Sequence, residues 1–343
     1  MDRKTFLTFI FPAFMAMSLL IAIPLGGVVY LSTQNSYIKT EFKTVTETSP
    51  LFGTVTKKIS QPVVGDDGLS VRVWENVGFG NYRSIMETDV IAEAVEEFDS
   101  SETSFFTAIY DVISDVSFLT ALEFTLIYTF ITTPLVIIIG FVVALAVNKM
   151  SSVGKLFFIP STLLPFIVAP VIGALAIKWL FMDNAVLTVA LENLGFGKIY
   201  FLESKWTTRF LIILYGVWHS APFAFIVFYA GLQTVPEDSL EAARIDGATK
   251  WQQTRYVTIP HLAPLFVFIL LIYIMDAYRI FEPVYVFSGG NSAISLQYLT
   301  YDLLATEGNF FKSSAAAVIT VGGVLLLLAP AIVKIYREYR RGF

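Results

Sequence analysis

The chain has 343 residues, of which 55% are hydrophobic and only 15% are charged, whereas soluble domains carry roughly 25% charged residues. A soluble protein of this length could not hide so much apolar surface, so we expect lipid to surround much of the chain. The absence of cysteine excludes disulfides, thiolate metal sites and cysteine nucleophiles. Two histidines are too few for a histidine-rich metal site, and the net charge of -5 gives no indication of a nucleic-acid partner.

Six long segments without charged residues predict six transmembrane helices. They are residues 5–38, 124–148, 156–177, 210–236, 256–275 and 313–333. Each is long enough to cross the hydrocarbon core, which takes about 20 apolar residues. The first has a longer apolar core than a secretory signal peptide, whose apolar region has about 7–15 residues. We therefore expect residues 1–31 to remain as an N-terminal transmembrane anchor.

The distribution of lysine and arginine predicts the orientation, because short cytoplasmic loops are enriched in both. With six spans both termini lie on one side, and that side carries Arg3, Lys4, Lys149, Lys155, Arg244, Lys250, Arg255, Lys334, Arg337, Arg340 and Arg341. The loop over residues 287–311, on the other side, has neither residue type. Both termini are therefore expected in the cytoplasm.

The segment 32–117 is the one sizeable polar region, and the orientation places it outside the cell. It has 14 Asp and Glu residues and six Lys and Arg residues, so it is acidic. A turn is expected at 65–68, a strand at 69–74 and a helix at 88–98. Such a region could be a solvated cap without chemistry or a docking surface for an external partner.

Signatures of catalysis are missing from the sequence. No glycine-rich phosphate loop ending in Gly-Lys-Ser or Gly-Lys-Thr occurs, so the chain is not expected to hydrolyse ATP itself. A membrane-embedded enzyme would need a paired base and nucleophile. His219 and Ser220 are the one candidate pair, and neighbouring residues on a helix do not face each other. We expect no catalytic residues and no metal site.

The loop at 233–261, between the fourth and fifth spans, reads as two short elements joined by a bend. Acidic residues after Pro236 favour the start of a helix, and its apolar face is expected to comprise Leu240, Ala243 and Ile245. Gly247 permits the bend, and Pro260 is expected to end the second element before the fifth span. From periodicity alone, the first helix could equally lie on the lipid surface.

One motif in this loop resembles a known family. Glu241-Ala242-Ala243, three residues, Gly247, nine residues and then Val257-Thr258-Ile259-Pro260 are similar to the EAA motif of ABC-importer permeases. The resemblance implies that the loop docks into a groove on a separate ATPase subunit. The residues expected to carry this coupling are Glu241, Ala242, Ala243, Asp246, Gly247 and Pro260.

Two further segments resemble the sugar and glycerol-3-phosphate permeases of this class. Residues 79–83 are similar to a Gly-x-x-Asn-Tyr segment before their second span, and residues 279–290 to the segment after their fifth. The latter usually ends in proline, where this chain has Asn291.

The resemblance implies an all-α polytopic protein of a bacterial inner membrane. It would have an anchor (1–31), an external acidic region (32–117) and a permease core of five helices (118–343). The implied partners are a second permease, an ATPase dimer that binds ATP, an external solute-binding protein, lipid and a sugar-like small molecule, with no cofactor of the chain's own. An anionic polyol such as glycerol 3-phosphate is an alternative solute, and a non-transporting membrane anchor or receptor is an alternative role.

Polar and aromatic residues within the spans are candidates for a solute pathway, because such groups are costly in lipid. They are Tyr215, Trp218 and His219 in the fourth span and Tyr273, Asp276, Arg279 and Glu282 in and after the fifth. Pro222 is expected to break the fourth span beside a polar cavity.

The charged candidates leave two interpretations open. Asp276 and Arg279 are three residues apart, as are Arg279 and Glu282, so both pairs could meet on one helix face. They could form an ion pair at the headgroups or line the path of a hydroxylated solute. Lys178 and Arg209 could either extend to the interface or add positive potential that favours an anionic solute.

Overall fold

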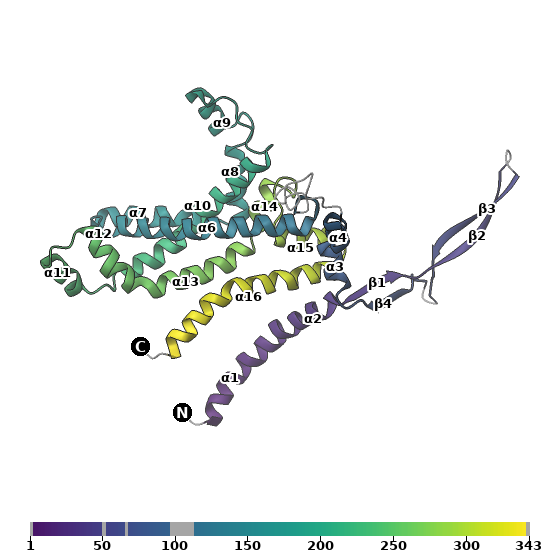
Figure 1. The fold of residues 1–343 in the computed structure, drawn as a ribbon, viewed down its shortest axis with the longest axis horizontal. Coiled ribbons are helices and arrows are strands. Elements are labelled where there is room, and N and C mark those ends of the chain that lie inside the picture. The colour runs from purple at the N-terminus through teal and green to yellow at the C-terminus, as the bar shows by residue number, and fades with distance from the viewer. Residues whose placement is uncertain (1–2, 50–52, 66–67, 97–112, 341–343) are drawn as a thin grey trace. The chain divides into compact units, whose positions relative to one another are not determined.

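The computed structural model describes residues 3–49, 53–65, 68–96 and 113–340 (Figure 1). The chain forms two compact units. The first comprises Met1–Thr88 and Leu303–Val318, and the second comprises Asp89–Asp302 and Ile319–Phe343. Helices α15 (Leu296–Ala305) and α16 (Phe310–Arg340) have residues in both.

The first unit begins with a long apolar helix. It consists of α1 (Arg3–Met17), the π-turn η1 (Ser18–Ala22) and α2 (Ile23–Ser32). Within it, Thr8–Ser32 is long and apolar enough to cross a membrane. This confirms the first predicted span, which ends at Ser32 rather than continuing to residue 38. Its apolar side chains are exposed within the chain, as expected for a helix that contacts lipid.

Two antiparallel strand pairs follow the first span. Strand β1 (Gln34–Ile38) pairs with β4 (Arg72–Asn76), and β2 (Thr40–Ser49) pairs with β3 (Gly53–Pro62). The strand expected at 69–74 therefore lies slightly later in the chain. At the turn expected over 65–68, the Gly68 N–H donates to the Gly65 carbonyl at 3.0 Å. Residues 66–67 of this turn lie outside the described residues.

Two short helices follow. Helix α3 (Gly80–Met86) belongs to the first unit, whereas α4 (Thr88–Glu96) belongs to the second unit from Asp89 onward. Helix α4 confirms the helix expected at 88–98 as far as Glu96, and residues 97–98 lie outside the described residues.

Asn81, from the segment that resembles sugar permeases, connects α3 to the end of the first span. The buried Asn81 amide donates hydrogen bonds to the backbone carbonyls of Ser32 and Gln34, both at 2.8 Å. The hydroxyl groups of Tyr82 and Ser32 lie 2.7 Å apart. This segment therefore fixes the junction between α2 and β1.

We predict that Asn81→Leu, which keeps the size of the side chain but removes both donors, destabilises this junction. Two buried carbonyls would lose their partners, at about 1–3 kcal/mol for each unsatisfied group. Limited proteolysis of the purified chain should then cut near residues 32–40 faster than in the parent. Ser84→Ala, at an exposed position of the same helix, is the control. Equal cleavage rates in Asn81→Leu and the control would contradict the structural role of Asn81.

The second unit is helical. Its elements are α6 (Ser117–Asn148), α7 (Ser152–Ile167), α8 (Pro170–Leu180), α9 (Val186–Leu191), η2 (Glu192–Phe196), α10 (Lys205–Leu232), α11 (Glu237–Ile245), α12 (Lys250–Gln253), η3 (Thr254–Thr258), α13 (Ile259–Tyr278), α14 (Glu282–Phe287) and α15 (Leu296–Ala305). Helices α6, α10 and α13 form its core (Figure 1).

Small residues allow α6 and α10 to pack closely. A Cβ at Gly140 would lie 2.8 Å from the backbone nitrogen of Phe225 and would also collide with Ala224. Close approach at small residues is a common way for membrane helices to associate. Next to this crossing, the rings of Phe141, Phe228 and Phe266 pack with centroid distances of 4.4–5.3 Å.

Five helices among the described residues are long and apolar enough to span a membrane, or six if one bent pair counts as a single span. The bent pair is α7 and α8, which meet at 97°. The prediction of an unbroken third span over 156–177 is therefore wrong. Val168 and Ala169 have extended backbone (ψ 132° and 134°). For Ala169 this is expected, because it directly precedes Pro170.

The expected break at Pro222 is also wrong, because α10 continues through it. A single proline is tolerated in a membrane helix where neighbouring helices surround the freed carbonyl. Pro222 itself is buried in the core of the unit. The mostly helical polytopic fold is otherwise as predicted.

Candidate functional site

The loop at 233–261 has the helix, glycine bend and second helix that the sequence predicts. Glu237 and Asp238 occupy the first turn of α11, where the helix dipole favours negative charge. Gly247 has φ +80°, a conformation that side chains disfavour. A capping box between Thr249 and Gln252 then starts α12.

The two faces of α11 differ in exposure. Leu240 and Ala243 are half-buried against the bundle, whereas Ile245 is 87% exposed. Ile245 therefore does not share their face, contrary to expectation, because five residues correspond to about 140° around a helix. Glu241 and Ala242 are exposed, as are Asp246 and Gly247.

Pro260 does not end the second element. Helix α12, the π-turn η3 and α13 form one continuous helix that is included in the Lys250–Phe287 span. Pro260 lies in the first turn of α13, directly after the π-turn, where the Ile259 N–H donates to the Thr254 carbonyl. A local π-turn accommodates the hydrogen bond that proline cannot make.

Five of the seven residues expected along a solute pathway lie around one cavity, which we call the polar pocket. It has a volume of about 140 Å³ and is lined by Tyr128, Pro170, Tyr215, Gly216, His219, Ser220, Asp276, Ala277, Arg279, Ile280, Glu282 and Pro283. The predicted members are Tyr215, His219, Asp276, Arg279 and Glu282. They come from α10, the end of α13 and the start of α14.

Tyr215 forms one wall of the polar pocket. Its hydroxyl donates to the Pro170 carbonyl at 2.7 Å, and its ring stacks on His219 with centroids 5.5 Å apart. A Cβ at Gly216 would collide with the hydroxyl of Tyr128, so glycine allows Tyr128 to enter the lining. The wall is thus aromatic, with polar atoms at its edges.

Two charged groups of the polar pocket are exposed, and the third, Glu282, is half-buried. Asp276 and Arg279 lie 4.0 Å apart, with side chains 65% and 59% exposed. The expected second pairing on the same helix face is wrong, because α13 ends at Tyr278 and Glu282 begins α14. Glu282 still lines the polar pocket, although it belongs to a different helix from Asp276.

The other two predicted residues lie outside the lining. Tyr273 is 4% exposed, and its hydroxyl has no hydrogen-bond partner among the described residues. Trp218 is 43% exposed and lines a separate, mainly apolar groove between α6, α7 and α10.

Several lining residues were not predicted. Tyr128 could have been found, since it is a polar aromatic residue in the apolar segment 124–148. Gly216 and Pro170 carry no such signal, because their roles depend on how helices meet. Within the described ranges, no three His, Asp or Glu side chains gather as metal ligands.

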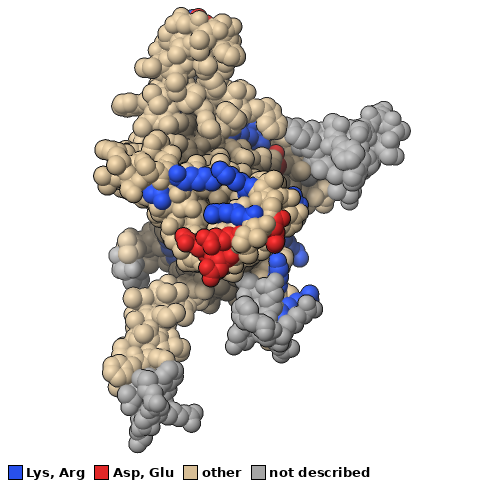
Figure 2. Space-filling view, turned by 90° about the vertical axis from the view of Figure 1, so that its left-hand side faces the viewer, with Lys and Arg blue, Asp and Glu red and all other residues tan. Residues whose placement is uncertain are grey.

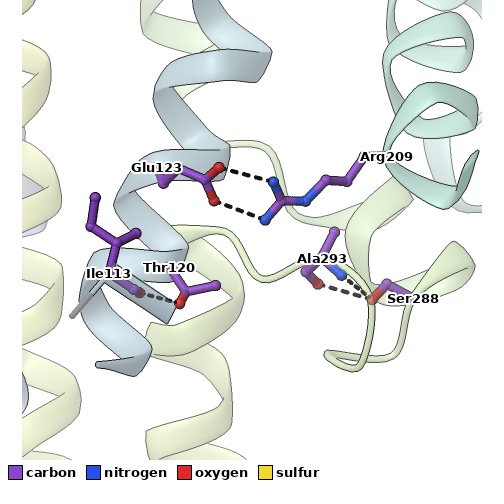
Figure 3. Close-up of polar contacts among 6 residues, drawn as sticks. All are labelled: Ile113, Thr120, Glu123, Arg209, Ser288 and Ala293. Carbon is purple, nitrogen blue, oxygen red and sulfur yellow. Dashed lines mark hydrogen bonds and ion pairs between the residues drawn. The ribbon is translucent and has the colours of Figure 1, made fainter. Parts of the chain in front are cut away.

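Arg209 is neutralised within the chain (Figure 3). Its guanidinium donates to both Glu123 oxygens at 3.1 and 2.9 Å and lies 5.2 Å from the ring centroid of Phe124 and 5.7 Å from that of Trp206. The expectation that it extends to the interface or supplies free positive potential is therefore wrong. The Lys178 ammonium donates to the Val286 carbonyl at 2.6 Å.

The turn that contains Asn291 is closed by Ser288 (Figure 3). The Ser288 hydroxyl accepts from the Ala293 N–H at 2.7 Å and donates to the Ala293 carbonyl at 2.9 Å. Gly289 and Gly290 have φ of +56° and +89°. A serine-centred turn thus occupies the place where the resemblance leads one to expect proline.

The comparisons with known proteins agree with this architecture. The chain is 28% identical over 242 residues to the trehalose transport system permease SugA of Mycobacterium tuberculosis, covering 66% of this chain and 73% of the relative. It is 31% identical over 225 residues to the trehalose/maltose transport system permease MalF of Thermococcus litoralis, covering 63% and 74%. A bacterial ABC transporter involved in alginate import has a similar fold, with a TM-score of 0.61 and 20% identity over 75% of this chain and 91% of that one.

A family model matches residues 103–338, a range that contains both the polar pocket and the loop at 233–261. The sequence-based resemblance to importer permeases is thereby confirmed. The chain belongs to the family of binding-protein-dependent transport system inner membrane components.

Proposed function

We propose that this chain forms half of the translocation pore of an ATP-binding-cassette importer for a neutral carbohydrate. The observation that carries the proposal is the polar pocket, which brings aromatic rings and charged groups from α10, α13 and α14 around one cavity. Membership of a transport family and relatives named for trehalose and maltose transport support it.

The chemistry of the polar pocket suits a hydroxylated solute. The Asp276 and Glu282 carboxylates accept hydrogen bonds from hydroxyl groups, and Arg279 donates them. The half-buried ring of His219 offers apolar surface to the C–H groups of a sugar ring, and the rings of Tyr128 and Tyr215, which are 4% and 2% exposed, support this wall. Ligand sites commonly combine such apolar surface with a few placed polar groups.

The charge of the lining favours a neutral sugar over an anionic polyol such as glycerol 3-phosphate. Two carboxylates and one guanidinium line the polar pocket. Arg209, which could have added positive potential, is paired with Glu123. An anionic solute would therefore meet a lining with excess negative charge.

ATP would be bound and hydrolysed by a separate ATPase dimer, since this chain has no phosphate loop. We infer that α11 docks on that subunit through its exposed residues Glu241 and Ala242, with Gly247 setting the bend. A second permease and an external solute-binding protein complete the assembly, and both termini of this chain are cytoplasmic. A membrane anchor or receptor would have no use for such a loop.

Reversing the Asp276–Arg279 pair tests the role of the polar pocket. Asp276→Arg with Arg279→Asp keeps the attraction between the two side chains, so we expect folding and assembly to be retained. It exchanges hydrogen-bond donor and acceptor toward the solute, so we expect uptake to be lost. Uptake of radiolabelled trehalose and maltose is measured per amount of assembled complex. The exchange Glu203→Lys with Lys205→Glu, outside the polar pocket, is the control and should leave uptake unchanged. Normal uptake by the Asp276/Arg279 exchange would make the pair purely structural.

A further inference from the structure

A second cavity lies beside the loop at 233–261, which we call the coupling loop because of its proposed role, and we call this cavity the basic pocket. Its volume is about 480 Å³. It is lined by Leu145, Asn148, Lys149, Leu232, Val235, Leu240, Arg244, Lys250, Gln253, Thr254 and Thr258. The C-terminal ends of α6 and α10 form its wall on the bundle side, and α11, α12 and η3 form the other.

Three cations from three elements converge on the basic pocket. Lys149 follows α6, Arg244 belongs to α11 and Lys250 begins α12. No Asp or Glu lines the cavity, and in the described part of the chain none of the three cations has an ion-pair partner. Cations held near each other without counter-charge repel, so an anion bound among them is stabilised.

The acidic side chains of the loop do not line the cavity. Glu237, Asp238, Glu241 and Asp246 are exposed, as are the three cations, but none of the four acids belongs to the lining. Figure 2, which faces this end of the chain, shows Lys and Arg side chains gathered beside a distinct group of Asp and Glu side chains. Leu240 and Arg244 are four residues apart, so they share the face of α11 that looks toward the bundle.

The rest of the lining adds hydrogen-bond donors and an apolar wall. Asn148 uses its oxygen to accept from Gln233 at 3.0 Å, which leaves its amide hydrogens for a ligand. Gln253 uses one amide hydrogen on the Ala248 carbonyl at 2.8 Å and retains another. Leu145, Leu232, Val235 and Leu240 provide the apolar surface.

We propose that the basic pocket binds a phosphate group, carried either by an anionic phospholipid headgroup or by a free phosphate compound, and that the bound anion ties the coupling loop to α6. Lysine and arginine are the side chains that recognise phosphate. A phosphate between Lys149 and the pair Arg244 and Lys250 links the bundle to both short helices. This site is separate from the polar pocket and from the exposed residues Glu241 and Ala242.

The test uses the full-length chain purified in an uncharged detergent, with thermal unfolding as the readout. The probes are inorganic phosphate and phosphatidylglycerol, each compared at equal ionic strength with potassium chloride, and phosphatidylcholine as the zwitterionic lipid. The pocket variant is Arg244→Gln with Lys250→Gln. The matched control is Lys155→Gln with Arg255→Gln, which removes the same number of positive charges from residues outside the lining.

We expect the active probe to raise the unfolding temperature of the parent and of the control. The pocket variant should need at least about tenfold more probe for the same rise, because it lacks two charge-assisted contacts. Stabilisation by phosphate identifies a free phosphate compound as sufficient. Stabilisation by phosphatidylglycerol alone, and not by phosphatidylcholine, identifies an anionic lipid headgroup. If neither probe stabilises the parent, or if control and pocket variant lose the response equally, the proposal is overturned.

Discussion

Replacing Arg209 by methionine is expected to destabilise the second unit by about 3 kcal/mol, near the lower end of values for breaking a buried ion pair. The Arg209 side chain is 4% exposed and that of Glu123 is 26% exposed, so the carboxylate left behind would be only partly hydrated. The variant also loses the stacking of the guanidinium against Phe124 and Trp206. Denaturant unfolding of the purified chain in detergent micelles measures the change.

The matched control removes both charges. In Arg209→Met with Glu123→Leu no unpaired charge remains, and we expect most of the lost stability to return, because apolar pairs can replace buried ion pairs at little cost. If the double variant is as unstable as Arg209→Met alone, packing rather than charge pairing would explain the effect.

Gly247→Asp is expected to abolish uptake while the chain still accumulates in the membrane. Aspartate is among the residues that best tolerate positive φ, and no atom of the chain lies within 4 Å of a Cβ at this position. Backbone strain at φ +80° is then the main cost within the chain, and the control below measures that cost separately. A loss of uptake would report a clash or repulsion with a partner outside the chain.

Gly308 provides the control for this experiment. It has φ +66° and equally open surroundings, but it lies far along the chain from the coupling loop. Gly308→Asp should transport like the parent. Equal losses in both variants would point to backbone strain, and normal uptake by Gly247→Asp would remove the docking role of the bend.

Local sequence patterns were sufficient where neighbouring residues determine the structure. The long apolar segments, the acidic start of α11 and the bend at Gly247 all depend on residues within one or two turns. The bend at 168–169 also has a local cause, because Pro170 disfavours helical backbone at the residue before it. The absence of charged residues over 156–177 predicts a span but carries no information about such a bend.

Contacts between distant segments explain most of the remaining differences. The pairing of Arg209 with Glu123 joins α10 to α6 across 86 residues, and nothing near Arg209 in the sequence indicates it. Pro222 leaves α10 intact within a buried helix crossing. The polar pocket likewise depends on Gly216 admitting Tyr128 from another helix, so its members could be predicted as polar residues within spans but not as one lining.

The most direct test of the central claim is solute uptake by a reconstituted importer. The chain is assembled in proteoliposomes with its second permease and ATPase dimer, and the external binding protein is supplied with radiolabelled trehalose or maltose. We predict uptake that requires both ATP and the binding protein, is lost in Gly247→Asp and is retained in Gly308→Asp. Uptake of these sugars without ATP, or undiminished uptake by the Gly247→Asp complex, would contradict it.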